Sequence, residues 1–184
     1  LVDRRRHDYR ALREWLVVMT RYALGPTLCT YGIVKVIQTQ FMFPGLSTLS
    51  QRVGDLSPMG LAWTFMGYST GYNLFTGGAE LLAGLLLLSR RTAPLGALVA
   101  IGVMANVVAL NFCYDIPVKL FSATLLLMAV FVAAPALRPL LALLVLRRPA
   151  ALPEDGPPIT GALRSVRLAV KLVIAASLTW TVLD

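Results

Sequence analysis

The chain has 184 residues, of which 57% are hydrophobic and 14% are charged. An ordinary soluble domain is roughly 25% charged. This composition therefore excludes an ordinary soluble domain and indicates that a lipid bilayer surrounds much of the chain. The net charge of +8 does not predict a nucleic-acid partner, because the basic residues lie mostly at the ends of apolar runs, where membrane topology places them.

Cysteine and histidine are too few for a metal or dithiol centre. Cys29 and Cys113 form no CxxC pair, and His7 is the single histidine. Haem, copper and zinc sites need several such ligands. We therefore predict no disulfide scaffold and no bound metal. The chain starts at Leu1 without methionine, which fits either a fragment or a trimmed chain, and no cleavable signal peptide is predicted, because the basic N-terminal stretch leads into a span too long for an h-region.

Five segments contain the roughly 20 apolar residues that cross a bilayer. In chain order they cover about 15–37, 68–89, 92–113, 117–134 and 166–183. Pro94 fits the first turn of the third segment. Residues 136–146 are interrupted by Arg138 and Pro139, and we expect them to continue the fourth helix and bend into the interface.

The connection 41–60 is neither tight nor fully polar. Ser57 followed by Pro58 predicts a helix start. The following residues, among them Trp63 and Phe65, are expected to lie in the membrane interface or to lengthen the second helix. An aromatic interface anchor is favoured over a lid above a ligand.

The sequence thus predicts an all-α membrane protein. A basic cytoplasmic tail (1–14) precedes a four-helix transmembrane bundle (15–147). A Pro-rich linker (148–162) then leads to a fifth, C-terminal transmembrane helix (163–184).

Basic residues predict the orientation, because lysine and arginine favour the cytoplasmic side. Under an alternating model one side carries Arg4, Arg5, Arg6, Arg10, Arg13, Arg90, Arg91, Arg138, Arg147, Arg148, Arg164 and Arg167. The other side has Arg52 and Lys119, with Lys35 at the membrane edge. We expect a multi-pass protein of the bacterial inner membrane, with its N-terminus in the cytoplasm and its C-terminus outside.

Glu80 is the most informative polar residue, because it falls near the middle of the second span. A charge at that depth is costly and usually faces the bundle interior with a partner. Helical spacing places Asn73, Gly77, Glu80 and Gly84 on one stripe. Small residues let another helix approach closely, so Glu80 is predicted to point at a neighbouring helix.

The first span offers a matching stripe of Arg21, Gly25, Cys29, Gly32 and Lys35. From the helical rise per residue, Arg21 lies roughly 9 Å from the inner end of its span, and Glu80 lies roughly 13 Å from the inner end of the second span. We therefore predict an ion pair between Arg21 and Glu80. Such a pair has two open roles: it fixes helix register, or Glu80 accepts protons or hydrogen bonds from a small polar head group.

A second polar cluster is expected at the outer end. Lys35, Asn73 and the run from Asn111 to Lys119 meet there. Asp115 is predicted to cap the fourth helix and to pair with Lys119 four residues later. Capping and snorkelling explain most of this cluster, and a shallow head-group pocket is the alternative. Asn106 is expected to face the same interior.

Several of these residues lie in short motifs that resemble those of the DoxX-like membrane proteins. The resemblance is carried by Gly32-Ile-Val-Lys35, by the Gly-rich run from Gly77 to Gly84 around Glu80, and by the stretch 110–120. It covers roughly residues 21–140 and implies a four-helix membrane bundle. Lys35 and Glu80 match the recurrent intramembrane charges of that family, which takes its name from small subunits of a thiosulfate:quinone oxidoreductase.

Three functions follow as hypotheses. The first is an accessory membrane subunit of a redox system that binds a quinone-like ligand through Arg21, Glu80 and Asn106 and meets a redox-protein partner. The second is a proton or small-solute carrier that uses Glu80. The third is a membrane scaffold or anchor. A catalytic role of its own is not favoured, and any enzymatic activity would be that of a quinone-linked oxidoreductase.

Overall fold

The computed structural model describes residues 9–149, and these form helices and connections without a β-strand. Four helices are long: α1 (Arg10–Val36), α4 (Thr70–Leu88), α5 (Ala93–Cys113) and α6 (Lys119–Leu144). Three short elements lie between α1 and α4, namely α2 (Leu46–Leu49), η1 (Val53–Asp55) and α3 (Pro58–Tyr68). The predicted fifth span and the linker before it fall outside the described residues.

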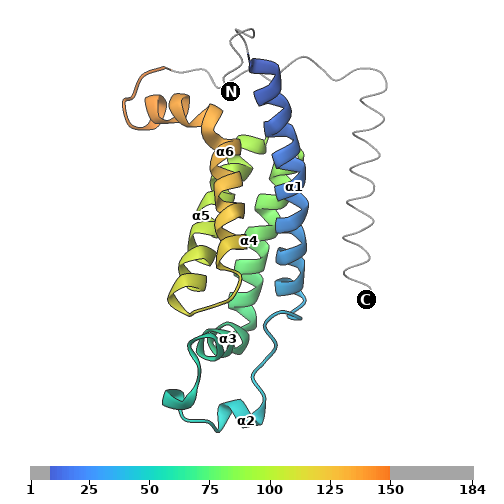
Figure 1. Cartoon of the computed structure of the whole chain (residues 1–184), viewed down its shortest axis with the longest axis vertical. Helices are drawn as coiled ribbons and strands as arrows, with labels where there is room; N and C mark the ends of the chain where they lie inside the picture. Colours follow the sequence, from blue (N-terminus) through green and yellow to red (C-terminus); the bar gives the residue numbers. More distant parts are fainter. Residues whose placement is uncertain (1–8, 150–184) are drawn as a thin grey trace, which may run out of the picture.

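The four long helices run side by side along one axis, and successive ones alternate in direction (Figure 1). The start of α1, the α4–α5 turn and the end of α6 lie at one end, while α2 and α3 lie at the other (Figure 1). We call these the basic end and the cap end. The basic end carries Arg13, Arg90, Arg91, Arg147 and Arg148. The cap is defined as residues 37–69.

Helices α1 and α4 form the tightest seam, because glycines of one helix face the backbone of the other. A Cβ added at Gly32 would lie 2.7 Å from the carbonyl oxygen of Gly77. A Cβ added at Gly84 would lie 2.6 Å from the carbonyl oxygen of Gly25. The two predicted small-residue stripes therefore do face each other, as close helix packing in membranes requires.

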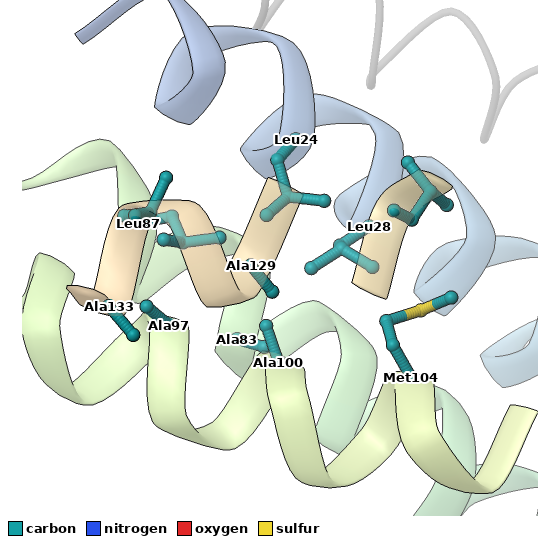
Figure 2. Close-up of a cluster of buried hydrophobic side chains, with 11 residues drawn as sticks. Leu24, Leu28, Ala83, Leu87, Ala97, Ala100, Met104, Ala129 and Ala133 are labelled. Carbon is teal, nitrogen blue, oxygen red and sulfur yellow. The ribbon is translucent and has the colours of Figure 1, made fainter. Parts of the chain in front are cut away.

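The buried core continues this pattern of small and large side chains. Leu24 and Leu28 of α1 and Leu87 of α4 are fully or almost fully buried. They belong to one cluster with Ala83 of α4 and with alanines and one methionine of α5 and α6: Ala97, Ala100, Met104, Ala129 and Ala133 (Figure 2). Alanines at the facing positions let α5 and α6 pack closely against α1 and α4 in this part of the bundle.

Within residues 9–149, three helices are long and apolar enough to cross a membrane: Thr70–Leu88, Ala93–Cys113 and Lys119–Leu143. They correspond to the second, third and fourth predicted spans. Large apolar side chains are exposed on all three, among them Leu82, Leu95 and Leu127. A surface of this kind suits hydrocarbon better than water, so the structure indicates a membrane protein.

Helix α6 extends beyond the predicted fourth span. It includes Pro135 and Pro139 and continues to Leu144, so residues 136–144 do prolong the helix. Proline removes a backbone donor and bends a helix. The orange C-terminal part of α6 turns away from the bundle axis in Figure 1.

The cap folds as a separate layer across one end of the bundle. Ser57 begins α3 as predicted, and its Oγ accepts a hydrogen bond from the backbone N–H of Gly60 at 3.0 Å. The alternative that this segment lengthens the second helix is wrong, because α3 stops at Tyr68 and Ser69 starts α4 as a new N-cap. The 37–45 connection touches α3 at Gly67, where an added Cβ would lie 2.2 Å from the carbonyl oxygen of Met42.

Candidate functional site

A cavity of about 390 Å³ lies between the cap and the cap-end halves of the long helices. Every long helix contributes to its wall, for example Tyr31 of α1, Phe75 of α4, Met104 of α5 and Phe121 of α6. The wall is therefore mainly aromatic and aliphatic. The volume of the cavity lies in the range of about 300–1,000 Å³ that is usual for sites of small organic ligands.

Lys35 and Glu80 form a buried ion pair in the wall of this cavity. Lys35 Nζ donates to Glu80 Oε1, and the two residues are 6% and 2% exposed. Two features position the pair: Lys35 lies in the last turn of α1, and Gly77 leaves room for it, because a Cβ at Gly77 would lie 2.8 Å from Lys35 Cβ. The prediction that Glu80 points at a neighbouring helix and meets a cation is confirmed.

The predicted partner was wrong, because Arg21 lies elsewhere. Gly32 faces Gly77 and Gly25 faces Gly84. This register sets Glu80 level with about residue 29 of α1, roughly 12 Å along the axis from Arg21. Arg21 is buried near the basic end instead, where its Nε donates to the carbonyl oxygen of Leu87 at 3.0 Å. Arg21 does not line the cavity.

Asn73 is buried but serves the cap rather than the cavity. Its Nδ2 donates to the carbonyl oxygen of Phe41 at 3.1 Å, which ties the 37–45 connection to α4. Phe41 and Trp63 then stack edge to face, with ring centroids 5.1 Å apart. Both rings line the cavity, so Asn73 helps to hold part of its wall in place.

Asn106 and Asn111 both line the cavity, although their environments differ. Asn111 is buried and donates through Nδ2 to Ser122 Oγ at 2.9 Å. Asn106 belongs to an exposed face of α5 together with Gly102, so the prediction that its stripe faces the interior was wrong. Nothing lies within 4 Å of a Cβ added at Gly102. These exposed lining residues mark a side on which the cavity opens at the bundle surface.

Asp115 and Lys119 form the predicted salt bridge at the cap end. The hydrogen bond from Lys119, together with its positive charge, holds the pKa of the Asp115 carboxyl below its usual value. The predicted capping role is wrong, because α6 begins at Lys119 and has no side-chain cap. Asp115 adopts a left-handed backbone with φ of 51° in the connection, and neither residue lines the cavity.

Sequence reasoning missed the aromatic residues of the cap as part of the site. Phe41, Trp63, Phe65 and Met66 line the cavity. The favoured prediction for the aromatic run was an interface anchor, and the less favoured alternative placed the run over a ligand. An interface anchor and a cavity wall both require amphipathic aromatic side chains, so the aromatic run alone does not distinguish these two roles.

The described residues contain no group of three or more His, Cys, Asp or Glu placed to hold a metal ion. Three apolar helices and an aromatic cavity with a buried ion pair in its wall together indicate a helical membrane protein with a ligand-sized internal site.

The chain is 38% identical over 119 residues to the uncharacterized protein YwoB of Bacillus subtilis (strain 168), a match that spans 65% of this chain and 75% of that protein. At this identity and coverage the chain belongs to the YwoB family. No family model matches the chain, and no solved structure matches it.

Proposed function

We propose that this protein is an integral membrane protein that binds a quinone-like amphiphile inside its helix bundle and serves as an accessory subunit of a redox system. The observation that carries the proposal is the aromatic cavity with the Lys35–Glu80 pair in its wall. Quinone-like molecules combine a flat ring, an apolar tail and a few polar head-group atoms. The cavity offers an apolar wall with a small number of polar groups, which is the usual composition of such sites.

The charge distribution on α1 supports a fourth crossing, although α1 is less apolar than α4, α5 and α6. Residues 15–36 contain two charged side chains, Arg21 and Lys35, and both are buried. The outward face of this segment is therefore uncharged. The segment is about 33 Å long, enough to cross the hydrocarbon of a bilayer.

The basic end supports a cytoplasmic N-terminus. Arginines gather there, among them Arg13, Arg90, Arg91, Arg147 and Arg148, beside Glu14, whereas the cap end has Arg52 and Lys119 beside Asp55 and Asp115. The positive-inside rule places the arginine-rich end in the cytoplasm. The cap and the cavity would then lie toward the outer face.

Cys113 tests this orientation because it is exposed at the cap end, whereas Cys29 is buried. A membrane-impermeant maleimide should label intact spheroplasts at Cys113, and Cys113→Ser should remove the signal. Labelling that appears only after the membrane is broken would place the cap in the cytoplasm instead.

The redox association has a narrower basis. Lys35 and Glu80, the two intramembrane charges in the segments that resemble DoxX-like proteins, pair with each other in this structure. The pairing supports the view that these two charges have the same role here as in the DoxX-like proteins. The resemblance to that family is the reason for proposing a quinone-linked partner.

Ligand extraction is the direct experiment. The full chain is purified in a mild detergent, and bound lipids are extracted and identified by mass spectrometry. A short-chain ubiquinone is then added in a thermal-unfolding assay. We expect a co-purified quinone and a rise in melting temperature with ubiquinone. An empty extract with no shift in melting temperature would refute quinone binding.

Two matched glycine variants localise the site. Gly102→Phe places a ring in the cavity wall, whereas Gly78→Phe places one on α4 outside the lining. A Cβ at either glycine meets no atom within 4 Å, so both variants should fold. The first should abolish the ubiquinone-dependent shift and the second should keep it. Equal behaviour would show that the ligand binds elsewhere.

A further inference from the structure

The polar atoms of the cavity wall differ in whether they already have partners. Within residues 9–149, two buried side-chain oxygens of the wall receive no hydrogen bond: Glu80 Oε2 and Gln40 Oε1. Both are acceptors. A buried acceptor without a donor is costly, on the order of 1–3 kcal/mol, so each of these atoms favours a ligand that supplies a donor.

Three hydroxyl and amide groups of the wall, those of Thr76, Asn111 and Ser122, already donate within the protein. Thr76 Oγ1 donates to the carbonyl oxygen of Tyr72 at 3.0 Å. Asn111 Nδ2 donates to Ser122 Oγ, which in turn donates to the carbonyl oxygen of Lys119 at 2.9 Å. These three groups therefore have no need of an acceptor from a ligand.

The ion pair favours one kind of head group over another. Lys35 donates one proton to Glu80 Oε1, and its ammonium has two more. A carbonyl oxygen could accept from Lys35, but it would leave Glu80 Oε2 without a donor. A hydroxyl group does both, because its oxygen accepts from the ammonium while its proton is donated to the carboxylate.

We infer that the ligand of this cavity bears a hydroxyl on its ring, as a phenol or hydroquinone does, and that the cavity prefers the reduced, hydroxylated form of a quinone-type ring to the oxidised form. This inference rests on the proposed function, because it requires that the cavity binds an amphiphile. It adds the chemical form of the head group, which the wall sets through Glu80 and Gln40.

Three probes with one ring and one tail separate the possibilities. Hexylhydroquinone, kept reduced with ascorbate, has two donors. Its dimethyl ether keeps the ring, the tail and both oxygens but has no donor, and hexylbenzoquinone is the oxidised form, which is no larger than the hydroquinone and also lacks a donor. Binding to the purified full chain is measured by isothermal titration calorimetry. A hydrogen bond to a charged group corresponds to roughly tenfold or more in affinity, so hexylhydroquinone should bind at least tenfold tighter than either analogue.

Variants then assign the preference to the two oxygens. Gln40→Leu removes one acceptor without touching the ion pair, and Glu80→Gln replaces the other with an amide of the same size. Each should reduce the preference for hexylhydroquinone severalfold. Thr76→Val is the matched control, since the Thr76 hydroxyl already has a partner, and it should leave the preference unchanged.

The outcomes distinguish the inference from the function on which it rests. Equal affinity for the three probes in the wild-type protein overturns the donor preference and leaves ligand binding intact. So does a preference that survives both Gln40→Leu and Glu80→Gln. Failure of all probes to bind, with an empty lipid extract, removes the proposed function as well. The wild-type comparison decides the matter even if Glu80→Gln does not fold.

Discussion

Adjacent glycines on α4 allow a sharp test of the helix seam. Gly77 faces α1, where an added Cβ would lie 2.7 Å from the carbonyl oxygen of Gly32 and 3.0 Å from the backbone nitrogen of Val36. Backbone atoms do not rotate away as a side chain does, so Gly77→Ala must push the two helices apart. Gly78 is the next residue, and a Cβ there meets no atom within 4 Å.

The expected free energies have opposite signs. Overpacking of this kind costs about 1–3 kcal/mol. Alanine in place of glycine within an open helix gains roughly 0.5–1 kcal/mol. Gly77→Ala should therefore be less stable than Gly78→Ala by about 1.5–4 kcal/mol. The free energy of unfolding is measured by SDS titration in mixed micelles, followed by circular dichroism.

The two variants have the same composition, so detergent binding and expression differ little between them. Equal stability of Gly77→Ala and Gly78→Ala would mean that α1 and α4 do not meet at these glycines. The register that brings Lys35 to Glu80 would then be incorrect.

Three further predictions use the same unfolding assay. Lys35→Met leaves Glu80 buried without its cation and should lower the free energy of unfolding by about 3–5 kcal/mol. Adding Glu80→Met should recover part of this loss. A Lys35→Met variant as stable as the wild type would show that the pair is not buried. Gln38→Gly should stabilise the protein by about 0.5–1 kcal/mol, because Gln38, just after the end of α1, has a left-handed φ of 59° that glycine adopts at less cost. A loss of stability would contradict this backbone conformation at residue 38. Asp115→Asn should change stability little at neutral pH, because the pair with Lys119 is exposed. Since the pKa of Asp115 is lowered, its small contribution is present at neutral pH and is lost only in acid, as pH falls through the lowered pKa; a loss near neutral pH would disagree with this.

Helix positions in the bundle could be predicted because apolar runs and local signals suffice for them. The Ser57-Pro58 start of α3 and Pro94 in the first turn of α5 follow from the backbone chemistry of single residues. The inward direction of Glu80 also followed, because a charge at that depth disfavours lipid contact.

The partner of Glu80 could not be predicted from distances to span ends. That count assumes that both helices start level with the membrane surface, whereas α1 begins at Arg10, before the predicted span. Contacts between glycines set the register instead, and they are a property of two helices together. Lys35 was already on the predicted stripe, so packing the stripes glycine to glycine would have identified it.

The sequence offered a pocket at this end only as an alternative, and it did not predict the size of the cavity or its aromatic wall. The cavity exists because the cap folds back over the bundle and brings Phe41 and Trp63 beside residues of α4 and α5. Small residues on α5 gave a misleading signal as well. Gly102 and Asn106 look like a packing stripe, but the space beside Gly102 is open.

The placement of Lys35 near the end of α1 affects how the chain is made. A lysine or arginine at the centre of a span opposes insertion by about 2.5–3.5 kcal/mol on translocon scales, and Lys35 and Arg21, which lie away from the centre of the 15–36 segment, each oppose it by less. During synthesis α1 emerges well before α4, so Lys35 has no ion-pair partner until Glu80 emerges. Stable integration of the first helix therefore depends on the arrival of the second long one, and the two should enter the bilayer as a hairpin. A truncated nascent chain that ends before residue 70 should remain extractable by alkali, whereas one that extends past residue 92 should not.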